Sequence, residues 1–247
     1  MNGPSPITSR LVRQEDLTPF ERDAMFRLLA DHFHGVTMRQ FARDLAEKNW
    51  ALLFGRGECL AGFSTMLVSE TCSEEGPISV VYSGDTIMAR EAWGTTALPR
   101  AWIAAVNSLR ASYPRGRYYW LLLTSGFRTY RFLPVFWREF FPRHDLAAPD
   151  ASRRLLEHLA RERFGDQYDA SAGVVRFKLP QRLRGPLGEV PRGRTADPHI
   201  GFFLTRNPGH ARGDELVCLT ELSAANLTSA GRRMVGPMPR ELSCHHC

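Results

Sequence analysis

One stretch of the chain limits its possible folds more than any other: a long apolar segment that leads through a short turn into an amphipathic helix. The segment covers residues 80–88, and the turn after it contains Arg90, Gly94, Thr95 and Thr96. Apolar residues then recur at the spacing of one helix face, at Leu98, Trp102, Ala105, Val106 and Leu109. Thr95 or Thr96 is suited to cap this helix. Because free N–H groups at a helix start attract anions, the sequence predicts a strand–turn–helix unit with an anion site at the turn.

Capping signals and apolar periodicity predict the elements around this unit over residues 7–142. They are a strand at 7–12, helices at 18–34 and 37–48, strands at 50–54, 59–68 and 78–88, the helix from about 97, a strand at 118–124 and a helix at 128–140. Antiparallel strands followed by a β-α-β crossover indicate class α+β, a three-layer α/β arrangement. We expect a mixed, mostly antiparallel central sheet with helices on both faces.

The composition changes after residue 142. The sequence predicts a helix at 151–163, strands at 174–179, 199–204 and 215–219, and a Pro-, Gly- and Arg-rich linker at 180–198. We therefore expect a first domain at 1–142, a C-terminal extension at 143–227 packed on it, and a flexible tail at 228–247. A lid over a site and a dimer arm both suit the extension, so the oligomeric state stays open.

Composition and charge exclude several classes of protein. Of 247 residues, 43% are hydrophobic and 11% aromatic, which excludes global disorder. The net charge of +6 favours anionic partners, but it is too mild and scattered for a dedicated nucleic-acid-binding protein. No signal peptide is visible, and no apolar run approaches the roughly 20 residues of a membrane-spanning helix. Five cysteines without regular spacing favour reduced thiols, so we expect a cytoplasmic protein.

The order of these elements, with a phosphate-binding turn after the fourth strand, resembles the GCN5-related N-acetyltransferase (GNAT) superfamily. The residues that carry the closer resemblance, to a poorly characterised bacterial branch, are the stretch Tyr82-Ser83-Gly84-Asp85-Thr86, the pair Trp93-Gly94 and residues 124–130. The resemblance covers about residues 7–142. It implies an enzyme that transfers an acyl group, acetyl or longer, from a thioester to an amine.

The resemblance also implies how the donor is held. In the superfamily the turn reads Arg/Gln-x-x-Gly-x-Gly/Ala, and here Arg90 matches the first position, Gly94 comes one residue late and the second glycine is missing. By this resemblance the donor-binding residues are Ile87, Met88, Arg90, Gly94, Thr95 and Thr96, the first two through their backbone. Acetyl-CoA or a longer acyl-CoA is then the co-substrate, and pantetheine on an acyl carrier protein is the alternative donor.

Asp85 and Tyr130 are the predicted catalytic residues. Burying a carboxylate in an apolar strand is costly unless it is paired, so Asp85 is either a base or amine anchor, or a structural carboxylate. The resemblance places Tyr130 where a tyrosine commonly protonates the leaving thiolate, and Asp85 near the usual acidic base. Tyr82, Ser83 and Ser125 are the predicted acceptor-binding residues. The acceptor is a small amine, an amino acid or a peptide lysine.

Two further patterns favour structural interpretations. An aromatic series predicts mainly helix–sheet core, with a tunnel for a longer acyl chain as the alternative: Tyr118, Tyr119, Trp120, Phe132, Phe136, Trp137, Phe140 and Phe141. The end of the chain, Cys244-His245-His246-Cys247, has metal-binding residue types, but a structural zinc site needs four well-spaced ligands and no second pair is present. We therefore predict no metal.

The sequence thus favours an N-acyltransferase. The alternatives are a GNAT-like fold that has lost catalysis and binds a ligand or partner, and an unrelated basic binding module. An enzyme is expected to tolerate neither Asp85→Asn nor Tyr130→Phe, whereas a binding module is expected to tolerate both.

Overall fold

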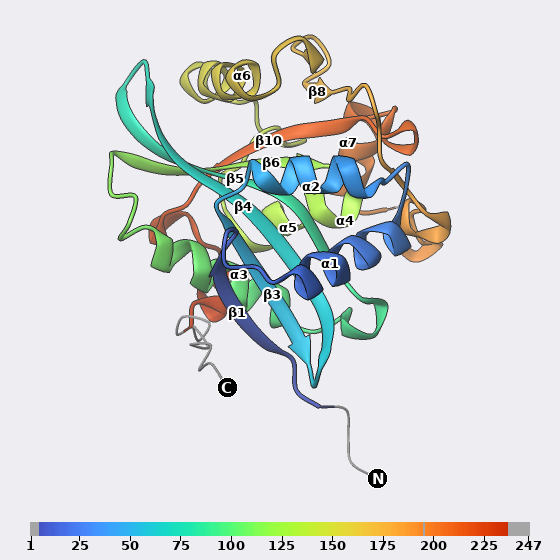
Figure 1. The fold of residues 1–247 in the computed structure, drawn as a ribbon. Coiled ribbons are helices and arrows are strands. Elements are labelled where there is room, and N and C mark those ends of the chain that lie inside the picture. The colour runs from blue at the N-terminus through green and yellow to red at the C-terminus, as the bar shows by residue number, and fades with distance from the viewer. Residues whose placement is uncertain (1–4, 195, 237–247) are drawn as a thin grey trace.

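A strongly twisted eight-stranded sheet organises the molecule (Figure 1). The computed structural model describes residues 5–194 and 196–236. The strand order is β1-β3-β4-β5-β6-β10-β8-β7, and all neighbouring strands are antiparallel except β5 and β6, which run parallel. The fold is therefore α+β with a mostly antiparallel sheet, as predicted.

The strands are β1 (Thr8–Arg13), β2 (Phe33–His34), β3 (Trp50–Arg56), β4 (Cys59–Ser73), β5 (Gly76–Met88), β6 (Arg117–Thr124), β7 (Tyr168–Asp169), β8 (Val174–Val175), β9 (Arg182–Leu183) and β10 (Glu215–Glu221). The α-helices are α1 (Pro19–His32), α2 (Met38–Ala46), α3 (Ala97–Leu109), α4 (Phe127–Tyr130), α5 (Phe132–Phe136), α6 (Asp150–Phe164), α7 (Pro198–Arg206) and α8 (Ser229–Met234). The short strands β2 and β9 form a separate pair.

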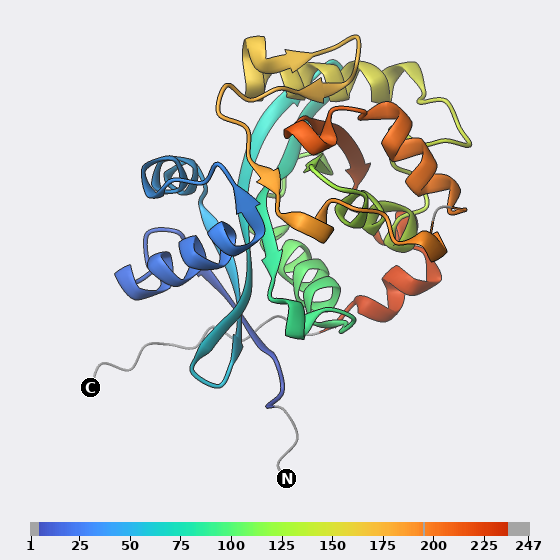
Figure 2. The ribbon, with the colours of Figure 1, turned by 90° about the vertical axis from the view of Figure 1, so that its right-hand side faces the viewer.

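Helices cover both faces of the sheet (Figure 2). On one face α1 and α2 pack on Leu53, Phe63 and Ile87, and α6 packs further along on β6 and β10. On the other face α3 and the C-terminal helices enclose a core that contains Trp102 and Trp120. Alternation of side chains along each strand divides the core in this way.

The predicted order of elements over residues 7–124 is confirmed, but the predicted helix at 128–140 is wrong. It is broken into α4 and α5, and Trp137 is already extended and bridges to Leu227. Pro134 explains the break, because a proline ring clashes with the carbonyl four residues earlier and supplies no N–H.

The C-terminal extension differs more from expectation. The predicted strand at 199–204 is wrong, since these residues lie in α7, which Asp197 caps through the His199 N–H and which begins with Pro198. The strand predicted at 174–179 is only β8, and the predicted linker contains β9. The strand predicted at 215–219 is confirmed as β10, which pairs with β6 inside the main sheet.

Residues predicted as a frayed end include α8, whose cap is Thr228. The tail sequence Cys244-His245-His246-Cys247 lies outside the described residues. Within residues 5–194 and 196–236, no helix is both long and apolar enough to cross a membrane. The same residues contain no cluster of three or more potential metal ligands.

Candidate functional site

The sheet opens between β5 and β6. These strands pair from Ile78 opposite Arg117 to Ser83 opposite Leu122, where their ladder ends. β5 then continues to Met88 and pairs with β4 alone. The two strands therefore separate toward the end of β5 that leads into the turn before α3.

A β-bulge lies in β5 at the point of separation. Ser83 pairs with Met66 on β4 and Thr86 pairs with Ser64, so two residues of β5 stand opposite one residue of β4. The extra residue shifts the alternation of side chains along the strand. Before the bulge, even-numbered residues of β5 face the side of the sheet that α6 covers, and after it the odd-numbered Ile87 faces that same side, where α1 and α2 pack.

The bulge consists of Gly84 and Asp85. A Cβ on Gly84 would lie 2.6 Å from the Cε of Lys48 and 2.6 Å from the Oγ1 of Thr65, so a larger residue here would displace these two side chains. The Lys48 side chain therefore lies across the bulge. Its Nζ donates a hydrogen bond to the carbonyl oxygen of Asp44, 2.9 Å away.

A polar cavity of about 630 Å³ lies on this side of the sheet. We call it the polar cavity because several charged side chains line it, of which three carboxylates and two cations are buried or half-buried: Asp44, Asp85, Glu215, Lys48 and Arg163. The two cations also lie near an aromatic ring of the cavity wall. Lys48 Nζ lies 5.2 Å and Arg163 Cζ 5.0 Å from the centre of the Tyr82 ring.

Burial moves the pKa values of Asp85, Glu215 and Lys48 toward neutrality. Burial raises the pKa of Asp85 to about 6, with Lys48 opposing the shift and Asp44 adding to it. Burial and the charge of Asp85 raise the pKa of Glu215 to about 8, although a hydrogen bond with Ser125 lowers it. Burial and the positive charge of Arg163 lower the pKa of Lys48. At pH 7 the cavity therefore holds an ionised Asp85 beside a largely protonated Glu215.

A second cavity, of about 570 Å³, lies on the opposite side of the sheet. We call it the aromatic cavity because Trp102, Trp120, Phe132 and Phe136 line it. The two cavities share the wall residues Phe33, Thr86, Ile87, Leu122, Ser125 and Thr129. They therefore meet where β5 and β6 separate.

Three arginines line the aromatic cavity, and we call them the arginine rim: Arg128, Arg131 and Arg194. Arg128 bonds to the Leu187 carbonyl, and its Cζ lies 5.4 Å from the centre of the Trp93 ring. Arg131 forms an ion pair with Asp197 at 2.8 Å. Among the described residues that line this cavity there is no aspartate or glutamate, so its surroundings favour an anionic ligand.

The structure brings most of the predicted site residues to these cavities. Tyr82, Ser83 and Asp85 line the polar cavity, Met88, Gly94 and Thr95 line the aromatic cavity, and Ile87 and Ser125 line both. The Oγ1 of Thr95 accepts the Ala97 N–H at 3.4 Å, so the helix start is partly capped by its own turn.

Three predicted residues line neither cavity: Arg90, Thr96 and Tyr130. Tyr130 is fully buried, and its hydroxyl donates to the Pro142 carbonyl oxygen at 2.9 Å. Arg90 and Thr96 are exposed on the turn. The side chain of Thr96 forms no cap hydrogen bond, although the residue occupies the capping position of α3.

Sequence reasoning missed Lys48, Glu215 and the arginine rim. Glu215 is the first residue of β10, in the extension to which no function was assigned. Lys48 ends an ordinary polar helix in sequence. In a sequence, such a group is recognised by a charged residue within an apolar segment. Glu215 gives only a weak signal of this kind, because it stands at the start of the apolar segment that begins with Leu216.

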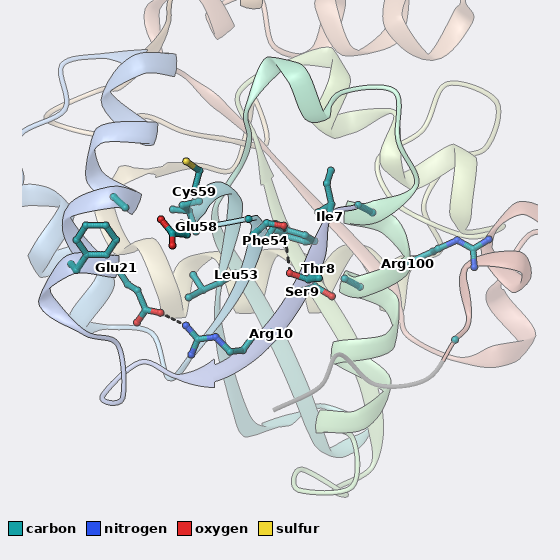
Figure 3. Close-up of a pocket in the computed structure, with 18 residues that line it drawn as sticks. Ile7, Thr8, Ser9, Arg10, Glu21, Leu53, Phe54, Glu58, Cys59 and Arg100 are labelled. Carbon is teal, nitrogen blue, oxygen red and sulfur yellow. Dashed lines mark hydrogen bonds and ion pairs between the residues drawn. The ribbon is translucent and has the colours of Figure 1, made fainter. Parts of the chain in front are cut away.

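A third hollow, of about 820 Å³, lies at the β1 edge of the molecule, between the β3–β4 turn and the starts of α1 and α3 (Figure 3). Its wall contains an ion pair between Arg10 and Glu21 and a hydrogen bond from Thr8 Oγ1 to the Gly55 carbonyl at 3.5 Å. These groups satisfy each other, and β5, which lines both other cavities, does not line this one.

No protein-family model matches the chain, and no curated protein matches it. Similar folds occur among solved structures. They include a probable N-acyltransferase from Enterococcus faecalis (16% identity, TM-score 0.40, 54% of this chain and 33% of that chain) and a GCN5-related N-acetyltransferase from Kribbella flavida (15%, 0.41, 54% and 33%). An acyl-CoA N-acyltransferase from Pseudomonas aeruginosa is also similar (17%, 0.37, 47% and 79%).

The Kribbella protein is, by its name, of the GNAT type that the sequence resembles. The likeness is to part of the fold only, since every TM-score is below 0.5 and the chain spans about a third of the length of the Enterococcus and Kribbella proteins.

Proposed function

We propose that this chain is an N-acyltransferase that moves an acyl group from a pantetheine thioester to an amine by direct attack. The observation that supports it is the meeting of two cavities of opposite chemistry at the separation of β5 and β6. A thioester in the aromatic cavity and an amine in the polar cavity would approach each other through this opening. Such an arrangement turns a bimolecular reaction into one between positioned groups.

The donor would lie along the open edge of β5. The Ala89 N–H donates to the Ala61 carbonyl on β4 at 2.9 Å, so by alternation the Met88 N–H and C=O point to the opposite, open edge. The Met88 carbonyl accepts the indole N–H of Trp93 at 2.7 Å, which leaves its N–H for a pantetheine carbonyl. The arginine rim would hold the phosphate end, which CoA and a carrier protein both present.

Asp85 is the proposed base. The neutral amine attacks the thioester carbon, the N–C bond forms, and the C–S bond breaks with its electron pair going to sulfur. Asp85, ionised at pH 7 because its pKa is about 6, accepts the proton that the amine nitrogen loses. A thiol has an ordinary pKa near 8.5, so the thiolate can leave unprotonated and take a proton from water.

The test is acyl transfer by the purified full chain. Release of free thiol from acyl-CoA is followed with a panel of amines, and mass spectrometry identifies the acylated amine. Asp85→Asn is expected to lower kcat by about 10²- to 10⁴-fold, the usual contribution of a positioned base. Asp44→Asn removes another carboxylate of the polar cavity and is expected to cost less than about tenfold. Equal rates for Asp85→Asn and the parent chain would refute this role.

A further inference from the structure

The inner end of the aromatic cavity, which we call the floor, is formed by the rings of Trp102, Trp120 and Phe132. Trp102 and Trp120 are only 2% and 4% exposed, and their ring centres lie 4.1 Å apart. Phe132 lies edge-on to both, at 6.4 and 6.0 Å. Trp137 packs behind them, 5.1 Å from Trp120, and seals the floor from the core side. These rings come from α3, β6 and α5, so three separate elements hold the floor in place.

The polar groups of the floor are limited to the indole N–H groups of its tryptophans. The indole N–H of Trp120 is already donated to the Ser83 hydroxyl at 2.8 Å. The arginines of the rim lie toward solvent, where Arg128 and Arg194 are exposed and Trp93 is 41% exposed. The cavity therefore grades from a cationic mouth to an apolar floor. An amphipathic molecule with an anionic head and a hydrocarbon end has the matching order of groups.

We propose that this floor is the binding site for the hydrocarbon chain of a medium- or long-chain acyl thioester, which makes such donors preferred over acetyl donors. The proposal rests on the proposed acyltransfer, because that reaction places the thioester at the meeting point of the cavities. The chain would run from that point along Leu122 to the aromatic floor. An acetyl group ends at its methyl carbon and would leave the half-buried ring of Phe132 in contact with water, which is unfavourable for apolar surface.

The size of the preference follows from the area buried. Each CH₂ group transferred from water to an apolar surface improves binding about fourfold. An octanoyl donor carries six more CH₂ groups than an acetyl donor. Since part of the chain will pack imperfectly, we expect at least a hundredfold gain in binding from acetyl to octanoyl, followed by a plateau when the floor is filled.

The experiment uses the full chain with acetyl-, butanoyl-, octanoyl- and dodecanoyl-CoA. Binding is measured by calorimetry and by tryptophan fluorescence, because Trp102 and Trp120 would contact the chain. Transfer to one amine acceptor is measured as kcat/KM on the same series. Phe132→Ala enlarges the floor and is expected to move the preferred length to longer chains. Phe26→Ala removes a similarly half-buried ring on α1 and is the matched control, with an unchanged profile expected.

The outcomes separate this inference from the proposed function. Transfer that is as efficient with acetyl-CoA as with octanoyl-CoA would overturn the chain-binding site while leaving the acyltransferase in place. Binding that strengthens with chain length without transfer to any amine of the panel would support the site and refute the enzyme. A length preference that Phe132→Ala does not alter would also overturn the assignment to this floor. Absence of binding at every length would overturn both.

Discussion

Replacing Lys48 with methionine should move the acidic limb of the pH–rate profile upward. The positive charge of Lys48 lowers the pKa of Asp85, which burial and Asp44 otherwise raise. Methionine keeps an unbranched apolar stem across Gly84 and removes only the charge and its hydrogen bond to the Asp44 carbonyl. The change therefore tests an electrostatic role with little change in packing.

The magnitude follows from Coulomb's law. Two unit charges taken as about 5 Å apart at an effective dielectric constant of about 20 interact by about 3 kcal/mol, which corresponds to about 2 pKa units. Loss of Lys48 would then raise the pKa of Asp85 from about 6 to roughly 8. At pH 7 the ionised fraction of Asp85 would fall from about nine-tenths to about one-tenth. We expect kcat/KM at pH 7 to fall about tenfold and to recover by about pH 9.

The assay is kcat/KM for thiol release from pH 5 to 10. Lys48→Arg keeps the charge and is expected to keep the limb near pH 6. Thermal denaturation over the same range controls for unfolding of a chain that has lost a buried lysine. A Lys48→Met variant that is slower at every pH, with its limb still near pH 6, would refute the electrostatic reasoning and leave Lys48 a structural residue.

Three further changes test neighbouring parts of the structure. Tyr130→Phe removes the hydrogen bond to the Pro142 carbonyl and is expected to cost about 1 kcal/mol, a fall in Tm of about 2–4 °C, with activity retained; a folded but inactive variant would restore Tyr130 as the acid. The folded chain keeps the proton of Glu215 up to a pH of about 8, whereas the unfolded chain loses it above its ordinary pKa of 4.5. The stability of the native state therefore falls as the pH rises from 4.5 to about 8. Glu215→Gln lacks this loss, and its Tm advantage should grow from pH 4.5 to 8; a constant difference would contradict the raised pKa. Arg128→Ala should raise KM for acyl-CoA about tenfold, whereas the exposed α2 residue Arg39, changed to Ala, should not; equal effects on KM would argue against the arginine rim.

Apolar periodicity and turn residues predicted helices and strands correctly where both indicated the same element. The strand, turn and helix at residues 80–109 follow from periodicity and a glycine turn, and the structure has them as β5, the turn and α3. The helix at 198–206 was missed because its apolar residues lie close together and suit a strand, although Asp197 followed by Pro198 is a helix-start signal. The clustered apolar residues favoured a strand and the capping residues favoured a helix, and the segment forms the helix.

The site was predictable only in part, for a physical reason. Tyr82, Ser83 and Asp85 lie on one strand, so one segment of sequence revealed them together. Glu215 reaches the same cavity because β10 pairs with β6, with Leu216 opposite Thr124. Periodicity shows that a segment is a strand, but it does not show which strand becomes its neighbour. The raised pKa values of Asp85 and Glu215 also depend on burial, which arises only when the sheet is assembled.

The bulge in β5 links these observations. In a regular strand, residues two apart face the same side, so Tyr82 and Thr86 would share one face and Asp85 would point to the other. Because the bulge inserts one residue, Asp85 joins Tyr82 in lining the polar cavity while Met88, further along, lines the aromatic cavity. One strand thereby supplies the proposed base to one cavity and an open backbone edge to the other. Gly84 permits this arrangement because it leaves room for Lys48, whose charge opposes the rise in the pKa of Asp85.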